Sequence, residues 1–190
     1  PSSRSIPTPS LDEPAEGIVT TLRGIVGFGD PLAAGFAMFA RRKAGREAVL
    51  IEDEPGSFTI LGERAREEAT SLIVFLPSRF GTSERQRLAR LLDEARRASI
   101  GFVGLVGTFR VHLDDSKAEE TERDALAMVE ARFAGARVVV FRPALVVGAG
   151  STTDRWLNRL GPLFPLAPSG LRTCFVEAEE LFAAIEAEAT

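Results

Sequence analysis

Residues 138–151 read VVVFRPALVVGAGS, and they decide the fold class of this chain. A short valine-rich run of this kind is typical of a strand in a parallel α/β protein. Working outward from it, short β-branched runs alternate with helical patterns along most of the chain. That alternation predicts an α/β fold in which crossover helices connect the strands of a doubly wound parallel sheet.

The expected elements are taken from the apolar periodicity of the sequence. Strands are expected at residues 18–26, 48–51, 57–61, 72–76, 101–106 and 137–142, and helices at 31–44, 83–98, 116–134 and 177–187. Capping-box patterns, in which a serine and a Glu or Gln three residues later satisfy free backbone donors, predict helix starts at Ser83 and Ser116. Residues 1–16 are rich in proline and serine and are expected to form a flexible leader or linker. A single Rossmann-like domain is expected over 17–190.

Three segments in the same order resemble the extended short-chain dehydrogenase/reductase family, which includes NAD-dependent sugar epimerases and dehydratases. Residues 138–151 are similar to that family's strand followed by an RPxxVYGPG segment, and 174–181 (CFVEAEEL) to its FVHVDDLA segment. Residues 102–108 (FVGLVGT) resemble its fifth strand, which ends near a catalytic Ser or Thr. The resemblance implies a Rossmann-like sheet that binds NAD(P). Because the chain stops soon after residues 174–181, we expect the fold to be truncated relative to the family.

Composition excludes several other classes of protein. A formal net charge of −4 lacks the basic excess of nucleic-acid binding, so we expect no nucleic-acid partner. Charged residues or prolines interrupt the apolar stretches, so we expect no membrane span. One cysteine and one histidine are too few for a disulfide or a common zinc site, which favours a cytoplasmic protein without a metal.

Residues 27–35 (GFGDPLAAG) occupy the place of the family's phosphate-binding turn, whose pattern is GxxGxxG. Gly27 matches the first position, Asp30 replaces the second glycine, and Ala33 stands at the third; Gly29 lies within the turn. Asp30 followed by Pro31 predicts an N-cap and first-turn pair, whose carboxylate takes the helix donors that a pyrophosphate would need. The sequence thus favours a capped turn over a working phosphate site. Glu52 and Asp53 argue the other way, because the family places a ribose-binding acid after its second strand.

The family's Tyr-x-x-x-Lys pair is incomplete, because the chain contains no tyrosine. Residues 113–117 (LDDSK) keep the lysine as Lys117 but have Leu113 in the tyrosine's place. The resemblance places the catalytic hydroxyl at Thr108. His112 is a further candidate acid or base near neutral pH. For all three the ordinary alternative is a strand-end or surface residue.

Three hypotheses follow from these observations. The leading one is a degenerate, non-catalytic epimerase/dehydratase-like domain that binds no cofactor and has a structural or partner-binding role. The resemblance implies pairing through helices 83–98 and 116–134, with a second copy or with a catalytic relative. The second is an atypical NAD(P)-dependent oxidoreductase or epimerase that uses Thr108, Lys117 or His112, and the third is one domain of a larger enzyme.

Overall fold

The computed structural model describes residues 22–51, 70–77, 80–96, 100–108, 110–111, 115–148, 151 and 175–190. The strands in these ranges are β1 (Leu22–Val26), β2 (Ala48–Ile51), β3 (Thr70–Phe75), β4 (Ile100–Val106), β5 (Arg137–Phe141), β6 (Leu145–Val147) and β7 (Phe175–Glu177). The helices are α1 (Pro31–Arg42), α3 (Thr82–Ala95), α4 (Ser116–Glu130) and α6 (Ala178–Glu188).

Five strands form one parallel sheet in the order β2-β1-β3-β4-β5. The chain leaves β1 for β2 on one side, and β3 then pairs with the other side of β1, so the direction of winding reverses at this strand. Such a reversal defines a doubly wound sheet, and open α/β sheets bind ligands at the carboxyl ends of the strands beside it. The expected Rossmann-like α/β class is therefore confirmed.

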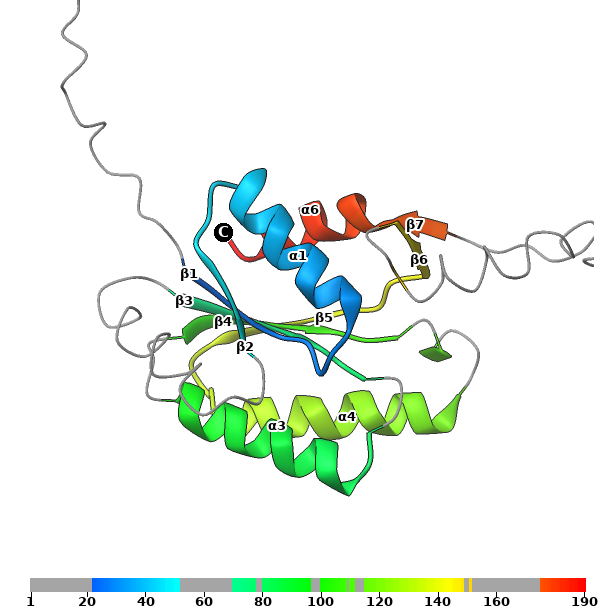
Figure 1. Cartoon of the computed structure of the whole chain (residues 1–190). Helices are drawn as coiled ribbons and strands as arrows, with labels where there is room; N and C mark the ends of the chain where they lie inside the picture. The colour runs from blue at the N-terminus through cyan, green and yellow to red at the C-terminus, as the bar shows by residue number, and fades with distance from the viewer. Residues whose placement is uncertain are drawn as a thin grey trace, which may run out of the picture.

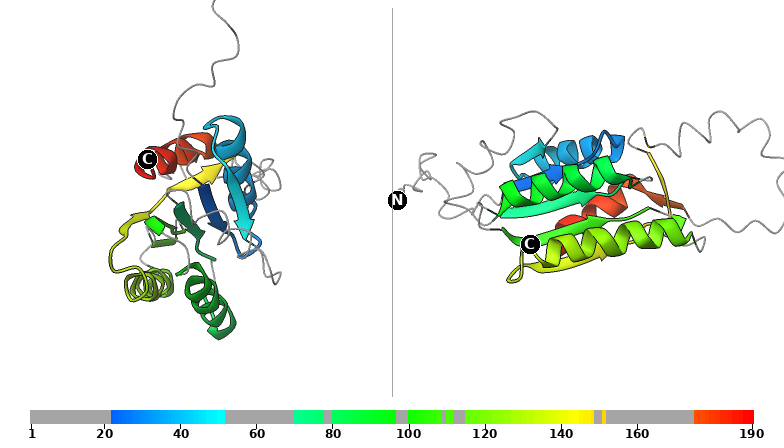
Figure 2. Two further views of the ribbon diagram at one scale, coloured as in Figure 1. Left: turned by 90° about the vertical axis from the view of Figure 1, so that its left-hand side faces the viewer. Right: turned by 90° about the horizontal axis from the view of Figure 1, so that it is seen from below.

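Helices cover both faces of the sheet, as Figures 1 and 2 show. One face carries α1 and α6, whose aromatic rings interlock with the sheet: the Phe36 ring centroid lies 5.5 Å from that of Phe182 and 6.0 Å from that of Phe75. The other face carries α3 and α4, which bury leucines, alanines and a valine on the strands. The short parallel pair β6–β7 leads directly into α6.

A buried ion pair fixes α6 on the sheet. Arg23, the second residue of β1, is fully buried and donates from Nε and Nη2 to the Glu186 carboxylate at 3.2 and 3.0 Å. Its Nη1 donates to the Ser71 hydroxyl at 2.7 Å, so each guanidinium nitrogen has a partner.

The expected elements correspond to the observed ones with shifted ends. The strand expected at 57–61 and the first residues of the one at 18–26 lie outside the described residues. Three helices end two to four residues earlier than expected, at Arg42, Ala95 and Glu130. Apolar residues continue beyond these ends, as at Phe133, but they pack from turns rather than from a helix.

Both predicted capping boxes were placed wrongly. The N-cap of α3 is Gly81, whose N–H donates to Glu84 Oε2 at 3.0 Å, and Ser83 already lies within the helix. The N-cap of α4 is Asp115, whose Oδ1 accepts from Lys117 N at 3.1 Å. Aspartate immediately before Ser116 is an equally good cap, and the spacing of the serine and the glutamate cannot distinguish the two.

Candidate ligand site at the carboxyl edge of the sheet

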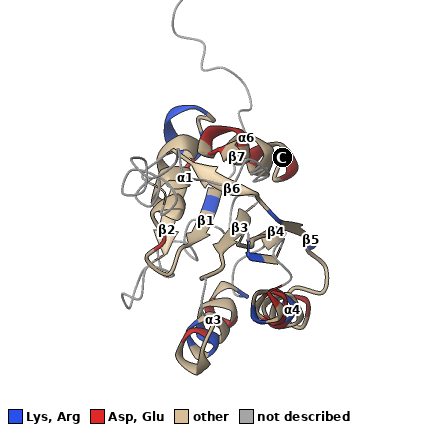
Figure 3. Ribbon diagram, turned by 90° about the vertical axis from the view of Figure 1, so that its right-hand side faces the viewer, with Lys and Arg blue, Asp and Glu red and all other residues tan. Residues whose placement is uncertain are grey.

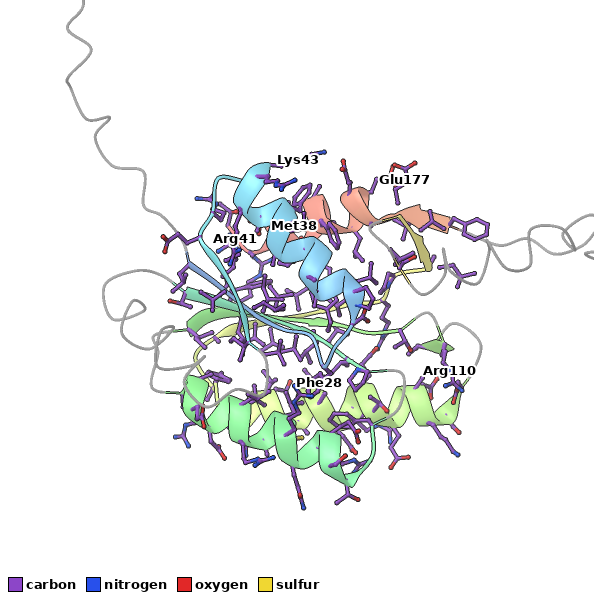
Figure 4. All side chains as sticks on the ribbon, in the orientation of Figure 1. Phe28, Met38, Arg41, Lys43, Arg110 and Glu177 are labelled. Carbon is purple, nitrogen blue, oxygen red and sulfur yellow. The ribbon has the colours of Figure 1, made fainter. Side chains whose placement is uncertain are left out.

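A tight turn joins β1 to α1 at the point where the sheet reverses. Asp30 N donates to Gly27 O at 2.7 Å, and both central residues have left-handed backbones, with φ of 48° at Phe28 and 77° at Gly29. Glycine adopts this conformation freely, whereas at Phe28 it costs about 1–2 kcal/mol. The Phe28 ring offsets that cost by packing toward α3, with the Arg87 guanidinium 5.0 Å from its centroid (Figure 4).

Gly27 lies so close to α1 that no side chain fits there. A Cβ built on Gly27 would lie 2.4 Å from the Cβ of Ala33, where van der Waals contact needs more than 3 Å. The strand end and the helix therefore approach as closely as they do in a dinucleotide-binding turn, where glycine is needed for the same reason. The close approach of β1 to α1 thus requires glycine at position 27.

The donors at the tip of α1 are already occupied. Asp30 Oδ1 accepts from Leu32 N at 2.9 Å, and Asp30 O accepts from Ala33 N at 3.1 Å. Pro31, the first helical residue, has no N–H. The predicted N-cap is confirmed, and the first turn offers an incoming anion a carboxylate in place of open N–H groups.

A small hollow lies farther along the same edge, beyond the ends of β3 and β4. It is open to solvent, has a volume of about 10 Å³, and is lined by Leu76, Pro77, Gly107, Thr108, Val111, Ala118, Thr121 and Glu122. Ligand pockets typically measure about 300–1,000 Å³, so this hollow is far too small for a nucleotide. Thr108, the predicted catalytic hydroxyl, is half-buried in its wall, two residues past the end of β4.

Glu122 is the charged group of this hollow. Its side chain is 7% exposed, and both carboxylate oxygens accept from Arg142 Nε, at 2.8 and 3.1 Å. Arg142 follows β5 and is itself 56% exposed; the hydrogen bond and charge of Glu122 raise the pKa of its guanidinium. Gly107 makes room for this pair, because a Cβ there would lie 3.1 Å from Glu122 Oε2.

Lys117 does not line the hollow. It is exposed in the first turn of α4, where its backbone N–H is held by Asp115. Asp115 in turn forms an ion pair with Arg110, at 2.5 Å between Oδ2 and Nη2; Arg110 is labelled in Figure 4. The structure therefore brings Thr108 and Glu122 together and leaves Lys117 outside.

The remaining predicted site residues divide into two groups. Gly27, Gly29, Asp30 and Ala33 lie together in one turn, as the sequence predicted. His112, Glu52 and Asp53 lie outside the described residues.

The sequence interpretation missed the pair of Glu122 and Arg142. A signal was present, because Glu122 falls on the apolar face of α4, three and seven residues before Ala125 and Val129. A carboxylate at such a position requires a buried partner.

The described ranges contain neither a metal-binding cluster nor a membrane-spanning helix. No group of three or more His, Cys, Asp or Glu side chains gathers there that could hold a metal ion. None of the helices in those ranges is long and apolar enough to cross a membrane.

Fold and turn together define a Rossmann-like α/β domain in which Asp30 caps the helix after β1. No protein-family description matches the sequence, and no curated protein sequence matches it. Among solved structures, the chain is similar to the nucleoside-diphosphate sugar epimerase from Corynebacterium glutamicum, with a TM-score of 0.59 and 15% identity. The similarity covers 90% of this chain and 43% of that one, so the chain spans less than half of the epimerase's length. It supports an epimerase-like fold.

Proposed function

We propose that this chain is a non-catalytic, epimerase-like domain that binds no dinucleotide at its β1 turn and serves a structural or partner-binding role. The observation that carries the proposal is the hydrogen bonding of Asp30 at the tip of α1. The cytoplasm is its proposed location, since the chain's one cysteine cannot form an internal disulfide.

The tip of α1 disfavours a bound diphosphate in two ways. First, Leu32 N and Ala33 N already donate to Asp30, so a phosphate would have to displace these hydrogen bonds. Second, the Asp30 carboxylate and a phosphate would lie a few ångströms apart with like charges. At about 4 Å this repulsion is about 1–4 kcal/mol for effective dielectric constants between those of water and a protein surface.

The absence of tyrosine supports the same proposal. In the family that the chain resembles, a phenol exchanges a proton with the substrate, and a lysine lowers its pKa. Lys117 is exposed on the first turn of α4, apart from the hollow that Thr108 lines. The described residues therefore supply a hydroxyl without the acid-base pair that would make it catalytic.

A nucleotide titration tests the proposal directly. NADH or NADPH is added to the full chain, and binding is followed by energy transfer from its one tryptophan, Trp156, and by thermal stabilisation. A ligand present at a hundred times its Kd adds about 2.7 kcal/mol. We expect neither signal at millimolar nucleotide; saturable transfer together with a rise in Tm would overturn the proposal.

Two variants of Asp30 separate the contributions of donor occupancy and charge. Asp30→Asn keeps an N-cap oxygen and removes the charge, whereas Asp30→Gly removes both. If Asp30→Gly alone gains nucleotide binding, the occupied N–H donors are what prevents binding in the unmodified chain. If both variants gain nucleotide binding, the charge of the Asp30 carboxylate is what prevents it.

The alternative function, an atypical NAD(P)-dependent enzyme, has one observation in its favour. Thr108 and the Glu122 carboxylate line the same hollow at the edge where α/β folds bind small molecules. That function predicts nucleotide binding, so the titration above distinguishes it from the non-catalytic one. One domain of a larger enzyme also stays a proposal, because the chain covers only 43% of the similar epimerase structure.

Pairing through α3 and α4 also stays a proposal. The charges on the outer surface of these helices weigh against it. Two ion pairs join the helices to each other, from Arg85 to Glu120 at 3.3 Å and to Asp124 at 2.6 Å, and a third joins Asp93 of α3 to Arg132 in the turn after α4 at 2.6 Å. Figure 3 shows both signs of charge spread over both helices. Stable dimer interfaces are usually depleted in charge at their centre, so the outer face of this layer is a weak candidate for one.

A further inference from the structure

The outer edge of β5 is an unpaired strand edge among the described residues, and four of its five residues are apolar. β5 is the last strand of the sheet, opposite β2 in Figure 3, and each of its five residues is partly exposed. In the adjacent β4, by contrast, Val103 and Leu105 are 0% exposed. The residues before and after β5 are described, whereas β2 runs into residues outside the described ranges.

This edge lacks the features that usually prevent strands from pairing. Residues 138–141 (VVVF) include no proline and no charge, and the pairing of β5 with β4 is regular. Unprotected edges of this kind pair with another strand. The charges at its two ends are neutralised within the chain, Arg137 by Glu188 and Arg142 by Glu122.

The backbone direction of β5 shows which groups face outward. Phe141 O accepts from Gly107 N of the β4 side at 2.9 Å, so the backbone groups of Phe141 point toward β4. Successive residues of a strand point their N–H and C=O groups to opposite sides. Val138 and Val140 therefore present their N–H and C=O groups at the free edge.

We propose that this edge pairs antiparallel with the same edge of a second copy, around a two-fold axis at Val139. This inference rests on the proposed partner-binding role and names the partner. In this register Val138 lies opposite the partner's Val140, and the two residues exchange both hydrogen bonds, so all four outward groups on each copy are satisfied. Arg137 lies opposite the partner's Phe141, which keeps like charges apart.

The flank of α4 is complementary to itself in the same arrangement. Glu122, Ala125 and Val129 of this helix face the sheet. Asp124 and Arg132 form ion pairs with α3. The opposite flank carries Arg123 and Glu130, both exposed and seven residues, or about two turns, apart. Within the described residues neither is in an ion pair.

Joining the two sheets brings the two α4 helices side by side. In each copy α4 lies over β4 and β5. Neighbouring strands are about 4.8 Å apart, so the axes of the two α4 helices lie about 10 Å apart, which is near the usual packing distance of helices. The two-fold axis makes the helices antiparallel. Arg142 lies three residues, or about 10 Å, beyond Val139 along the strand direction. Glu122 reaches Arg142 with a side chain that leans toward the N-terminus of α4, so the axis through Val139 crosses α4 roughly five residues after Glu122, about midway between Arg123 and Glu130. Arg123 then lies opposite the partner's Glu130, and Glu130 opposite the partner's Arg123.

Sedimentation of the full chain over a range of concentrations tests the pairing. We expect a dimer for the unmodified chain and a monomer for Val140→Pro, which removes an outward N–H and leaves the ladder to β4 intact. Val140→Thr keeps that N–H and the branched shape, and we expect it to dimerise. Circular dichroism establishes that each variant is folded.

A charge exchange provides a test that does not alter the core. Arg123→Glu and Glu130→Arg each place like charges across the axis at two symmetric contacts, and each is expected to weaken dimerisation by about tenfold. The double variant restores opposite signs and is expected to recover the dimer, which a merely structural role of these exposed residues would not produce.

A monomer at every concentration, or a dimer that neither the proline nor the charge variants weaken, would overturn the inference. The NADH titration on the same preparations keeps the two proposals separable. A chain that binds nucleotide refutes the non-catalytic function, and a chain that stays monomeric without binding it refutes only the pairing.

Discussion

Replacing Glu186 by glutamine is expected to destabilise the domain strongly, because it leaves the Arg23 guanidinium without a counter-charge inside the core. Arg23 is 0% exposed, and two of its three hydrogen bonds go to this carboxylate, at 3.2 and 3.0 Å. Removing one partner of a buried ion pair costs about 3–5 kcal/mol. For a chain of 190 residues each kcal/mol lowers Tm by about 2–4 °C, so the expected fall is about 6–20 °C.

The chain supplies a matched control on the same helix. Glu179 forms an ion pair with Lys43, but the two side chains are 64% and 56% exposed. Exposed pairs contribute about 0–1 kcal/mol, so Glu179→Gln removes the same charge with little effect. Lys43 is labelled at the outer surface in Figure 4.

Urea denaturation followed by circular dichroism measures both variants. Replacing both buried partners, as in Arg23→Met with Glu186→Leu, removes the charges together and is expected to recover most of the stability, because well-packed apolar pairs replace buried ion pairs at little or no cost. Equal and small effects of Glu186→Gln and Glu179→Gln would refute the conclusion that the Arg23 pair lies in a dry core.

Three further predictions concern the turns and helix ends. Gly27→Ala is expected to cost about 1–3 kcal/mol in urea denaturation because its Cβ would lie 2.4 Å from that of Ala33, and Ala33→Gly in the same chain should recover part of it. Gly107→Ala is expected to cost about 1–3 kcal/mol through its 3.1 Å approach to Glu122 Oε2, and a double-mutant cycle with Glu122→Ala should remove that cost. The hydrogen bond from its own backbone amide lowers the pKa of Glu84 from 4.5, so Glu84 stabilises the fold above that pH and loses the effect as the pH falls through its folded pKa. The stability difference between the unmodified chain and Glu84→Gln should therefore vanish on acidification, and a constant difference in Tm down to pH 2 would contradict this reasoning.

The sequence predicted the layers of the fold because they depend on local pattern. Leu88, Leu91, Leu92 and Ala95 repeat at helical spacing, and all four are buried on the sheet in α3. The strand Ala48–Ile51 has the expected bounds, because charge and glycine precede its apolar run and acids follow it. Helix ends were less predictable, since Phe133 continues the apolar pattern of α4 from a turn.

The candidate site was predictable only where its residues are neighbours in the sequence. Asp30 caps a helix that begins at the next residue, so its role followed from the order Asp-Pro and a helical pattern. Glu122 and Arg142 are twenty positions apart and meet through the packing of α4 on β5. Arg23 and Glu186 are 163 positions apart. No local pattern indicates such partners, although each buried charge required one.

The capped turn and a bound dinucleotide compete for the same donors, and the magnitudes favour the cap. An Asp N-cap contributes about 1 kcal/mol, which a diphosphate would forfeit on displacing it, and like-charge repulsion adds about 1–4 kcal/mol. Together these amount to about 2–5 kcal/mol, a loss in affinity of roughly thirtyfold to several-thousandfold. Gly27 and Ala33 hold β1 against α1 by direct contact of the strand end with the helix. Under the proposed function the sheet is a scaffold for other contacts, and the β5 edge is where the proposed pairing would add backbone hydrogen bonds.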